Sequence, residues 1–261
     1  MIMEERLYFE EGGDSANPAI VFLHGLLGSS RNWRSVCKDL ENDFHTIAFD
    51  LPNHGQSFQE TESSVASMSE SVIKKIGQIG LDNFFVCGHS LGGKVAMKMA
   101  CDYSHRIKKL LVVDIAPRDY PADHHLPTLK ALADLDLIGF NKRKEVDEAL
   151  AEKIQNWAFR QFLLTNLGSI EGRFKWIPNL DGLISSIKSL SSNPLNQNDL
   201  FEGPSLFLRA GKSGYVRSEH FDEIKRYFPT AEIKTLTEAG HDLHVDDRKG
   251  FVSILSKFLE V

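Results

Sequence analysis

The sequence predicts an α/β fold in which a mostly parallel central sheet is flanked by helices and carries an inserted helical cap. Three observations predict it. Short apolar segments alternate with helix-like segments, a helical block interrupts that alternation, and a G-x-S-x-G motif joins one apolar segment to a helix. Strands that alternate with helices typically form a parallel sheet that is covered on both faces.

The predicted strands are short apolar runs rich in β-branched and aromatic residues, at 19–23, 45–49, 84–87, 110–115, 205–208 and 231–236. Their continuous apolar character fits strands that are buried on both faces better than an alternating pattern would. Segments with helical periodicity separate most of them, at 32–40, 67–79, 94–103, 218–227 and 248–259. The order of elements therefore indicates a doubly covered sheet.

Residues 121–202 break this rhythm, because they show helical patterns at 126–135, 144–155, 157–167 and 181–190 and no convincing strand. A helical block of this size between two strands of one sheet is typical of an inserted cap over the carboxyl ends of the strands, where ligands bind. We therefore expect a core domain formed by residues 1–120 and 203–261 and a cap formed by residues 121–202.

The G-x-S-x-G motif is Gly88-His89-Ser90-Leu91-Gly92, with a predicted strand before it and a predicted helix after it. This setting predicts a nucleophile elbow, a sharp turn that lifts the serine hydroxyl out of the fold. We expect Ser90 to adopt a strained backbone conformation, and the two glycines to relieve clashes across the turn.

A serine hydroxyl needs a base within hydrogen-bond reach to become a good nucleophile. On this fold the expected order along the chain is Ser, then Asp or Glu, then His. His241 fits best, since it follows the last predicted strand by a few residues. His244 is its closest rival, whereas the pair His124-His125 has the character of a solvated surface pair.

The acid has to orient the imidazole and stabilise its charged form. The loop after the strand at 205–208, the usual place, holds no carboxylate through residue 216. Glu219 and Asp222 follow, but within a predicted helix whose solvated face they fit. One strand earlier, Asp114 ends an apolar run, and a lone buried carboxylate is costly unless it is paired. We therefore predict Asp114 as the acid, with Glu219 and Asp222 as alternatives.

Acyl transfer also requires preorganised N–H groups for the oxyanion. We expect the backbone N–H of Leu91, directly after the nucleophile, and that of Leu26, in the loop after the first strong strand, to supply them.

Composition excludes several other classes of function. The net charge of −6 gives no footprint for nucleic acid or an anionic membrane, and no apolar run is long enough to span a bilayer. No phosphate-binding loop or metal motif occurs, so we expect no cofactor and no metal. Three cysteines in no disulfide or zinc pattern, and a first segment without signal-peptide character, favour a cytoplasmic location.

Four motifs lie along nearly the whole chain: His24-Gly25-Leu26-Leu27-Gly28, Asp50-x-x-x-His54-Gly55-x-Ser57, Gly88-His89-Ser90-Leu91-Gly92-Gly93 and Gly240-His241. As a set they resemble the α/β-hydrolase superfamily. Two further segments, Val113-Asp114-Ile115-Ala116-Pro117 with Tyr120-Pro121, and Phe162-Leu163-Leu164-Thr165-Asn166-Leu167, resemble the YbfF-like esterases. That resemblance implies an acyl-ester hydrolase with a small helical cap, and an acid on the strand of Asp114. Departures are Ala210, where relatives tend to have glycine, and Asp242, where an aromatic residue is common.

The expected function is hydrolysis of carboxylic esters of short- to medium-chain acyl groups, or of thioesters, through an acyl-enzyme. A carbon–carbon bond hydrolase or lyase of the same fold remains an alternative, because fold does not fix function. A non-catalytic ligand-binding protein on this scaffold is a third reading, and it predicts an incomplete triad. The expected partner is a small ester, with the oligomeric state left open.

Overall fold

The computed structural model describes residues 6–260, and across them a seven-stranded sheet has the order β1-β3-β2-β4-β5-β8-β9. The expectation about a signal peptide concerns residues 1–5, which lie outside this range. The predicted core domain also includes residues 1–5 and 261, which are not described. All neighbouring pairs are parallel except β1 with β3. The strands are β1 (Phe9–Gly12), β2 (Ala19–Leu23), β3 (His45–Phe49), β4 (Phe84–His89), β5 (Ile107–Val113), β8 (Ser205–Ala210) and β9 (Glu232–Leu236).

Each of the six predicted strands is present, within a few residues of its predicted ends. The antiparallel edge strand β1 was not predicted. Its sequence, Phe-Glu-Glu-Gly, has no apolar run, because a half-exposed edge strand does not need one.

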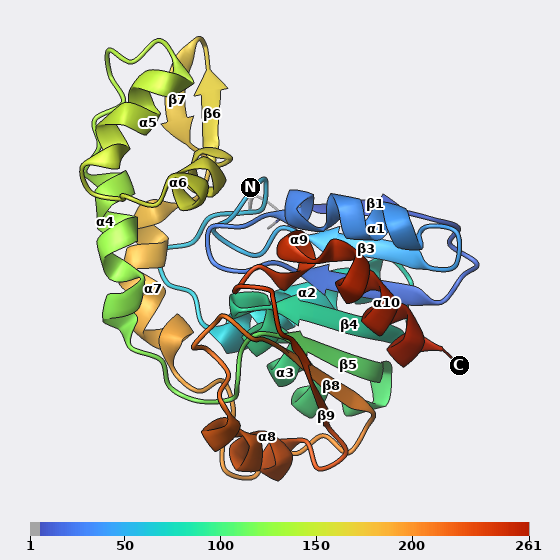
Figure 1. Ribbon diagram of the computed structural model, residues 1–261. Helices are drawn as coiled ribbons and strands as arrows, with labels where there is room; N and C mark the ends of the chain where they lie inside the picture. The colour runs from blue at the N-terminus through green and yellow to red at the C-terminus, as the bar shows by residue number, and fades with distance from the viewer. Residues whose placement is uncertain (1–5, 261) are drawn as a thin grey trace.

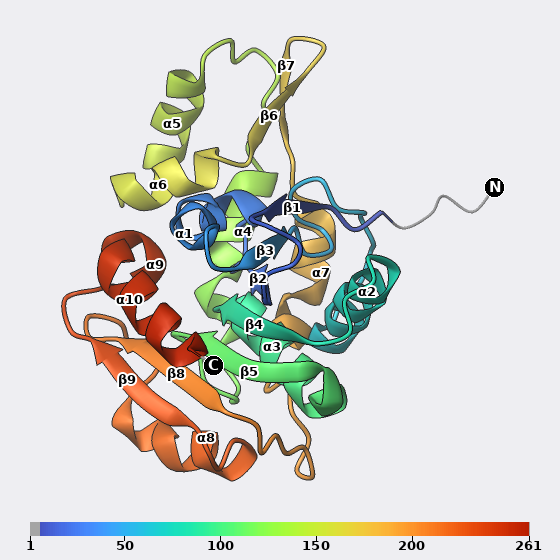
Figure 2. The same cartoon turned by 90° about the vertical axis from the view of Figure 1, so that its right-hand side faces the viewer.

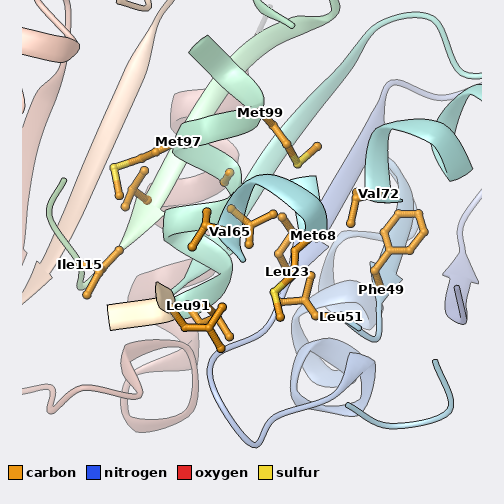
Figure 3. Close-up of a cluster of buried hydrophobic side chains, with 14 of the residues drawn as sticks. Leu23, Phe49, Leu51, Val65, Met68, Val72, Leu91, Met97, Met99 and Ile115 are labelled. Carbon is orange, nitrogen blue, oxygen red and sulfur yellow. The ribbon is translucent and has the colours of Figure 1, made fainter. Parts of the chain in front are cut away.

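Helices cover both faces of the sheet, as Figures 1 and 2 show. They are α1 (Arg34–Leu40), α2 (Val65–Gln78), α3 (Leu91–Asp102), α8 (Phe221–Tyr227), α9 (Leu243–Asp246) and α10 (Arg248–Leu259), with short 3₁₀ turns η1 (Ser30–Trp33), η2 (Ser104–Arg106) and η4 (Ser218–His220). Alternate residues of the strands enter two hydrophobic clusters. Val21 of β2 packs on the side of α2 and α3, part of which Figure 3 shows, and Phe22 packs on the side of α1 and α10.

The block between β5 and β8 contains η3 (Ala122–His124), α4 (Leu126–Ala133), α5 (Arg143–Ala151), α6 (Trp157–Leu164) and α7 (Leu180–Ser191). It lies beyond the carboxyl ends of the strands, at the upper left of Figure 1. The prediction that this block holds no strand is wrong, since β6 (Leu167–Ile170) and β7 (Arg173–Trp176) form an antiparallel hairpin. Glu171 and Gly172 connect them with φ of 50° and 79°, the backbone of a tight two-residue hairpin turn.

Buried polar contacts join this block, called the cap below, to the core. The Lys94 ammonium on α3 donates to the carbonyls of Leu190, Ser191 and Ser192 at the end of α7, at 3.2, 2.6 and 2.7 Å. The Asn166 amide donates to the Leu27 carbonyl at 2.7 Å. Carbonyl groups at a helix end lack intrahelical partners, so the ammonium satisfies α7 where it meets the core. Over residues 6–260, no helix has the length and apolar character needed to cross a membrane.

Candidate active site

Ser90 stands between β4 and α3 with φ of 51° and ψ of −115°, which confirms the strained turn expected of a nucleophile elbow. Its N–H donates to the Val113 carbonyl at 3.0 Å, which ties the turn to β5. A Cβ at Gly88 would lie 2.1 Å from the Gly92 carbonyl oxygen, and a Cβ at Gly92 would lie 2.3 Å from that of Leu23. Both positions therefore require glycine, because these neighbours are backbone atoms that cannot move aside.

Asp114 and His241 come together from distant parts of the chain. The His241 Nδ1–H donates to Asp114 Oδ2 at 2.8 Å, and the Ala210 N–H donates to Asp114 Oδ1 at 3.0 Å. The Asp114 side chain is fully buried, so both of its oxygens find the partners that a buried carboxylate needs. This bond leaves Nε2 of the neutral imidazole without a proton and therefore able to act as a base.

Asp114 has a φ of 49°, a left-handed conformation that is uncommon for a residue other than glycine. Its N–H nevertheless continues the sheet by donating to the Leu208 carbonyl at 2.9 Å. The chain thus bends at the residue directly after β5, where the side chain meets His241. Strained backbone of this kind persists only where the surroundings hold it, and it gathers at functional sites.

The alternative residues do not reach this pair. Glu219 is exposed and lies 3.6 Å from His220, and Asp222 is in the first turn of α8. Within residues 6–260 neither carboxylate contacts His241. His244 is buried and stacks on Trp33 with ring centroids 4.4 Å apart, and burial lowers the pKa of its imidazole to about 3.

Ser90 and His241 line one cleft of about 410 Å³, which Leu26 and the cap residues Phe159 and Phe162 also line. In the described part of the chain, no hydrogen bond joins Ser90 Oγ to His241 Nε2. Catalytic hydrogen bonds are often long without substrate and tighten when it binds. The cleft thus brings the candidate nucleophile and the candidate base to one space that a substrate can occupy.

Leu91 is the first residue of α3, and Leu26 follows β2 in the loop at the same edge of the sheet. Both residues lie beside Ser90 in the lining of a second, smaller cavity. Within residues 6–260 neither backbone N–H donates a hydrogen bond. Two unengaged N–H groups next to a serine hydroxyl suit the stabilisation of an oxyanion.

Two functional candidates escaped the sequence reasoning. The Tyr215 ring stacks on the His241 ring at 3.9 Å between centroids, with 16° between the planes. The Asn166 amide, which comes from the cap, holds the carbonyl of Leu27, whose own φ is 59°. Tyr215 stands in the loop that lacks an acid, and Asn166 lies two residues after the end of α6, so only the tertiary structure shows what each side chain contacts.

Several histidines surround the reactive groups in neutral form. Burial lowers the pKa of His24 to about 4, and its ring accepts from the Leu51 N–H while it donates to the Gly25 carbonyl. His89 donates from Nε2 to the His241 carbonyl at 2.9 Å, and burial holds its pKa well below the usual value. These contacts fix the loops that carry the candidate residues without adding charge.

The expectation of a solvated His124-His125 pair is wrong for His125. Its ring is half-buried and lines both cavities beside Ser90. Burial, reinforced by His124 and His241, lowers its pKa to about 4. Its Nε2 lies 3.4 Å from the Tyr215 hydroxyl, so this cap residue meets the residue that stacks on His241. The position before α4 has no sequence signal for this role.

The chain matches known proteins over nearly its whole length. Residues 18–162 match the family model described as alpha/beta hydrolase fold. The chain is 37% identical to the "sn-1-specific diacylglycerol lipase ABHD11" of Mus musculus, over 95% of this chain and 82% of that protein. It is 28% identical to "Esterase YbfF" of Escherichia coli (strain K12), over 93% of each chain.

A solved structure, "Marine microorganism esterase", superposes with a TM-score of 0.95 at 33% identity, covering 98% of this chain and all of the other. The resemblance to the YbfF-like esterases is therefore confirmed, and so is the predicted fold. Together with the elbow at the end of β4, these matches show that the chain belongs to the α/β-hydrolase fold family, as a member of the esterase/lipase type.

Proposed function

We propose that this protein hydrolyses carboxylic esters of short- to medium-chain acyl groups, and thioesters of the same acyl groups, with Ser90 as nucleophile, His241 as base and Asp114 as the acid that orients it. The observation that carries this proposal is the 2.8 Å bond from His241 Nδ1 to the buried Asp114, next to a serine held at positive φ. The relatives that are esterases and lipases support the same class of reaction.

In the first step His241 Nε2 takes the hydroxyl proton while Ser90 Oγ attacks the carbonyl carbon of the ester. The resulting oxyanion accepts hydrogen bonds from the N–H groups of Leu26 and Leu91. The imidazolium, stabilised by Asp114, then donates its proton to the leaving alcohol. An acyl group remains on Ser90.

In the second step water enters, His241 removes a proton from it, and the hydroxide attacks the acyl carbon. Collapse of the second oxyanion releases the carboxylic acid and returns the proton to Ser90 Oγ. The reaction consumes one ester and one water and produces one acid and one alcohol, with no cofactor in the cycle.

The test is Ser90→Ala with p-nitrophenyl esters as substrates and a fluorophosphonate probe as the label. We expect the variant to lose about 10⁴- to 10⁶-fold in kcat and to take up no probe. Ser185→Ala is the control, because this exposed hydroxyl only donates to the Asp181 carbonyl of its own helix. A Ser90→Ala enzyme that keeps its activity or its labelling contradicts the proposal.

A further inference from the structure

Two cavities of very different size meet at Ser90. The cleft described above has a volume of about 410 Å³, and the second cavity has about 30 Å³. Ser90, Leu26, His125 and Tyr215 line both of them. An ester bound at Ser90 has an acyl part and an alcohol part, which leave the carbonyl carbon in different directions, so each cavity can take one part.

The position of His241 indicates which cavity takes the alcohol part of the ester and which takes the acyl part. The base that attacks must afterwards protonate the leaving alcohol, so that oxygen has to lie within reach of the imidazole. His241 lines the large cleft and does not line the small cavity. Leu91, a donor to the oxyanion, lines the small cavity and does not line the cleft. The alcohol therefore belongs in the cleft, and the acyl chain belongs in the small cavity.

The volume of the small cavity limits the acyl chain. A cavity of about 30 Å³ has room for roughly two water-sized groups. Because the carbonyl carbon itself sits at Ser90, this space takes the methyl of an acetyl group or the ethyl of a propionyl group. The cleft, by contrast, is within the size range of sites that enclose drug-sized molecules.

The walls of the small cavity belong to packed structure and leave little room to yield. Leu91 and Ile115 are buried in the core cluster that Figure 3 shows. Ile187 and Leu190, from α7, close the cavity on the side of the cap and are also buried. Inserting further carbons into close-packed surroundings forces side chains out of their preferred rotamers.

Lys94 holds the cap wall in place. This residue lines the small cavity, and its ammonium binds three carbonyls at the end of α7, so the helix that carries Ile187 is fixed to α3. Ser90 immediately precedes α3. The distance from Ser90 to the cap wall is therefore set by one helix and one buried lysine.

We propose that the enzyme acts on acetyl and propionyl esters of large apolar alcohols, with Ile187 as a residue that limits the acyl length. This inference rests on the proposed function and narrows it. The stacked rings of Phe159 and Phe162 in the cleft lining favour an alcohol with an aromatic or extended apolar group.

Two series of substrates test it on the purified protein. Across p-nitrophenyl esters, kcat/KM is expected to stay high for acetate and propionate and to fall by about tenfold or more at butyrate and beyond. Across acetates of ethanol, benzyl alcohol and 2-phenylethanol, we expect kcat/KM to rise with the size of the alcohol. A preference for octanoate over acetate contradicts the inference.

Ile187→Ala removes three carbons from the wall and is expected to move the preferred acyl chain to butyrate or valerate, with the order of alcohols unchanged. Leu183→Ala is the matched control, since Leu183 is buried on the same helix but does not line the cavity. It is expected to lower the melting temperature by a similar amount and to leave the order of acyl lengths unchanged.

If Ile187→Ala widens the range of alcohols instead, the two sides are reversed and the inference is wrong. Labelling by the fluorophosphonate distinguishes this failure from failure of the proposed function. An enzyme that labels at Ser90 but prefers long acyl chains contradicts only the inference, whereas no labelling and no ester hydrolysis contradict the proposed function itself.

Discussion

The core and the cap contribute to the site in different ways. The core supplies the candidate reactive groups from loops at the carboxyl ends of β2, β4, β5 and β9, where backbone hydrogen bonds and positive φ angles fix Ser90 and Asp114. The cap supplies side chains that bound the space, such as Ile187, and polar tethers such as Asn166. The proposed chemistry therefore depends on backbone geometry in the core, whereas the proposed selectivity depends on side chains of the cap.

The proposed acid of the core, Asp114, is the place where a single substitution should change the rate most. Asp114→Asn keeps the shape and tolerates the left-handed backbone, but its amide can hold the imidazole in the wrong tautomer. We expect kcat to fall by up to ~10⁴-fold with little change in KM, as measured with p-nitrophenyl acetate.

Asp242→Asn is the matched control for this experiment. This neighbouring carboxylate lies 3.9 Å from the His89 ring nitrogen and makes no hydrogen bond to the His241 ring in the described chain. Only a small change in kcat is expected. If both variants behave alike, Asp114 has no special role, and Glu219 and Asp222 have to be tested next.

A smaller effect is expected from the cap tether. Asn166→Ala removes the donor to the Leu27 carbonyl, so the loop that carries Leu26 loses a tether to the cap. A lost buried hydrogen bond costs about 1–3 kcal/mol, which corresponds to roughly 5- to 150-fold in kcat if it acts on the transition state.

Thr165→Ala tests whether the effect of Asn166 is specific. The Thr165 hydroxyl is exposed and donates to the Phe162 carbonyl of the preceding turn, at 2.6 Å. This variant should keep kcat within about twofold. Equal losses of kcat in the two variants would show that the cap responds to any substitution after α6. The Asn166 bond would then have no specific role, and the proposed division of roles between core and cap would be contradicted.

Stability, rather than rate, reports on the buried histidines of the core loops. Burial lowers the pKa of His24 to about 4 and the pKa values of His54 and His244 to about 3. Below about pH 6.5 the unfolded chain binds protons that the folded chain does not bind. The free energy of unfolding should therefore fall by about 1.4 kcal/mol per pH unit for each such histidine, down to about pH 4.

Urea unfolding of His244→Phe at pH 7.5, 6.0 and 5.0 measures how much His244 contributes to the change of unfolding free energy with pH. The buried Nδ1 of His244 finds no partner in the described chain, and its ring lies between Trp33 and Phe251, so phenylalanine suits the site. We expect the slope to decrease by about 1.4 kcal/mol per pH unit below pH 6. An unchanged slope would contradict the neutral state of His244.

The sheet and its helices could be predicted because parallel strands buried on both faces leave continuous apolar runs in the sequence. The hairpin β6-β7 could not, since its four-residue strands are shorter than the helical patterns around them. Its one signal was the turn pair Glu171-Gly172, which is followed by Arg173–Trp176, where polar and apolar residues alternate. Ser90 and His241 could be predicted because each follows a predicted strand at the expected place along the chain. The contacts of Asn166 and Tyr215 could not, because their partners lie far away in the sequence.

Lys94 links α3, the helix that follows Ser90, to the cap, and this has a consequence for how the molecule moves. Swinging α7 away from the core would separate three carbonyl acceptors from the buried Lys94 amine, and a buried polar group that loses its partners costs free energy. We therefore expect any opening of the cleft to leave α7 in place and to move the Phe159 and Phe162 side chains that line the cleft. On this expectation the small cavity keeps its shape through each turnover, while alcohol and water exchange through the larger cleft.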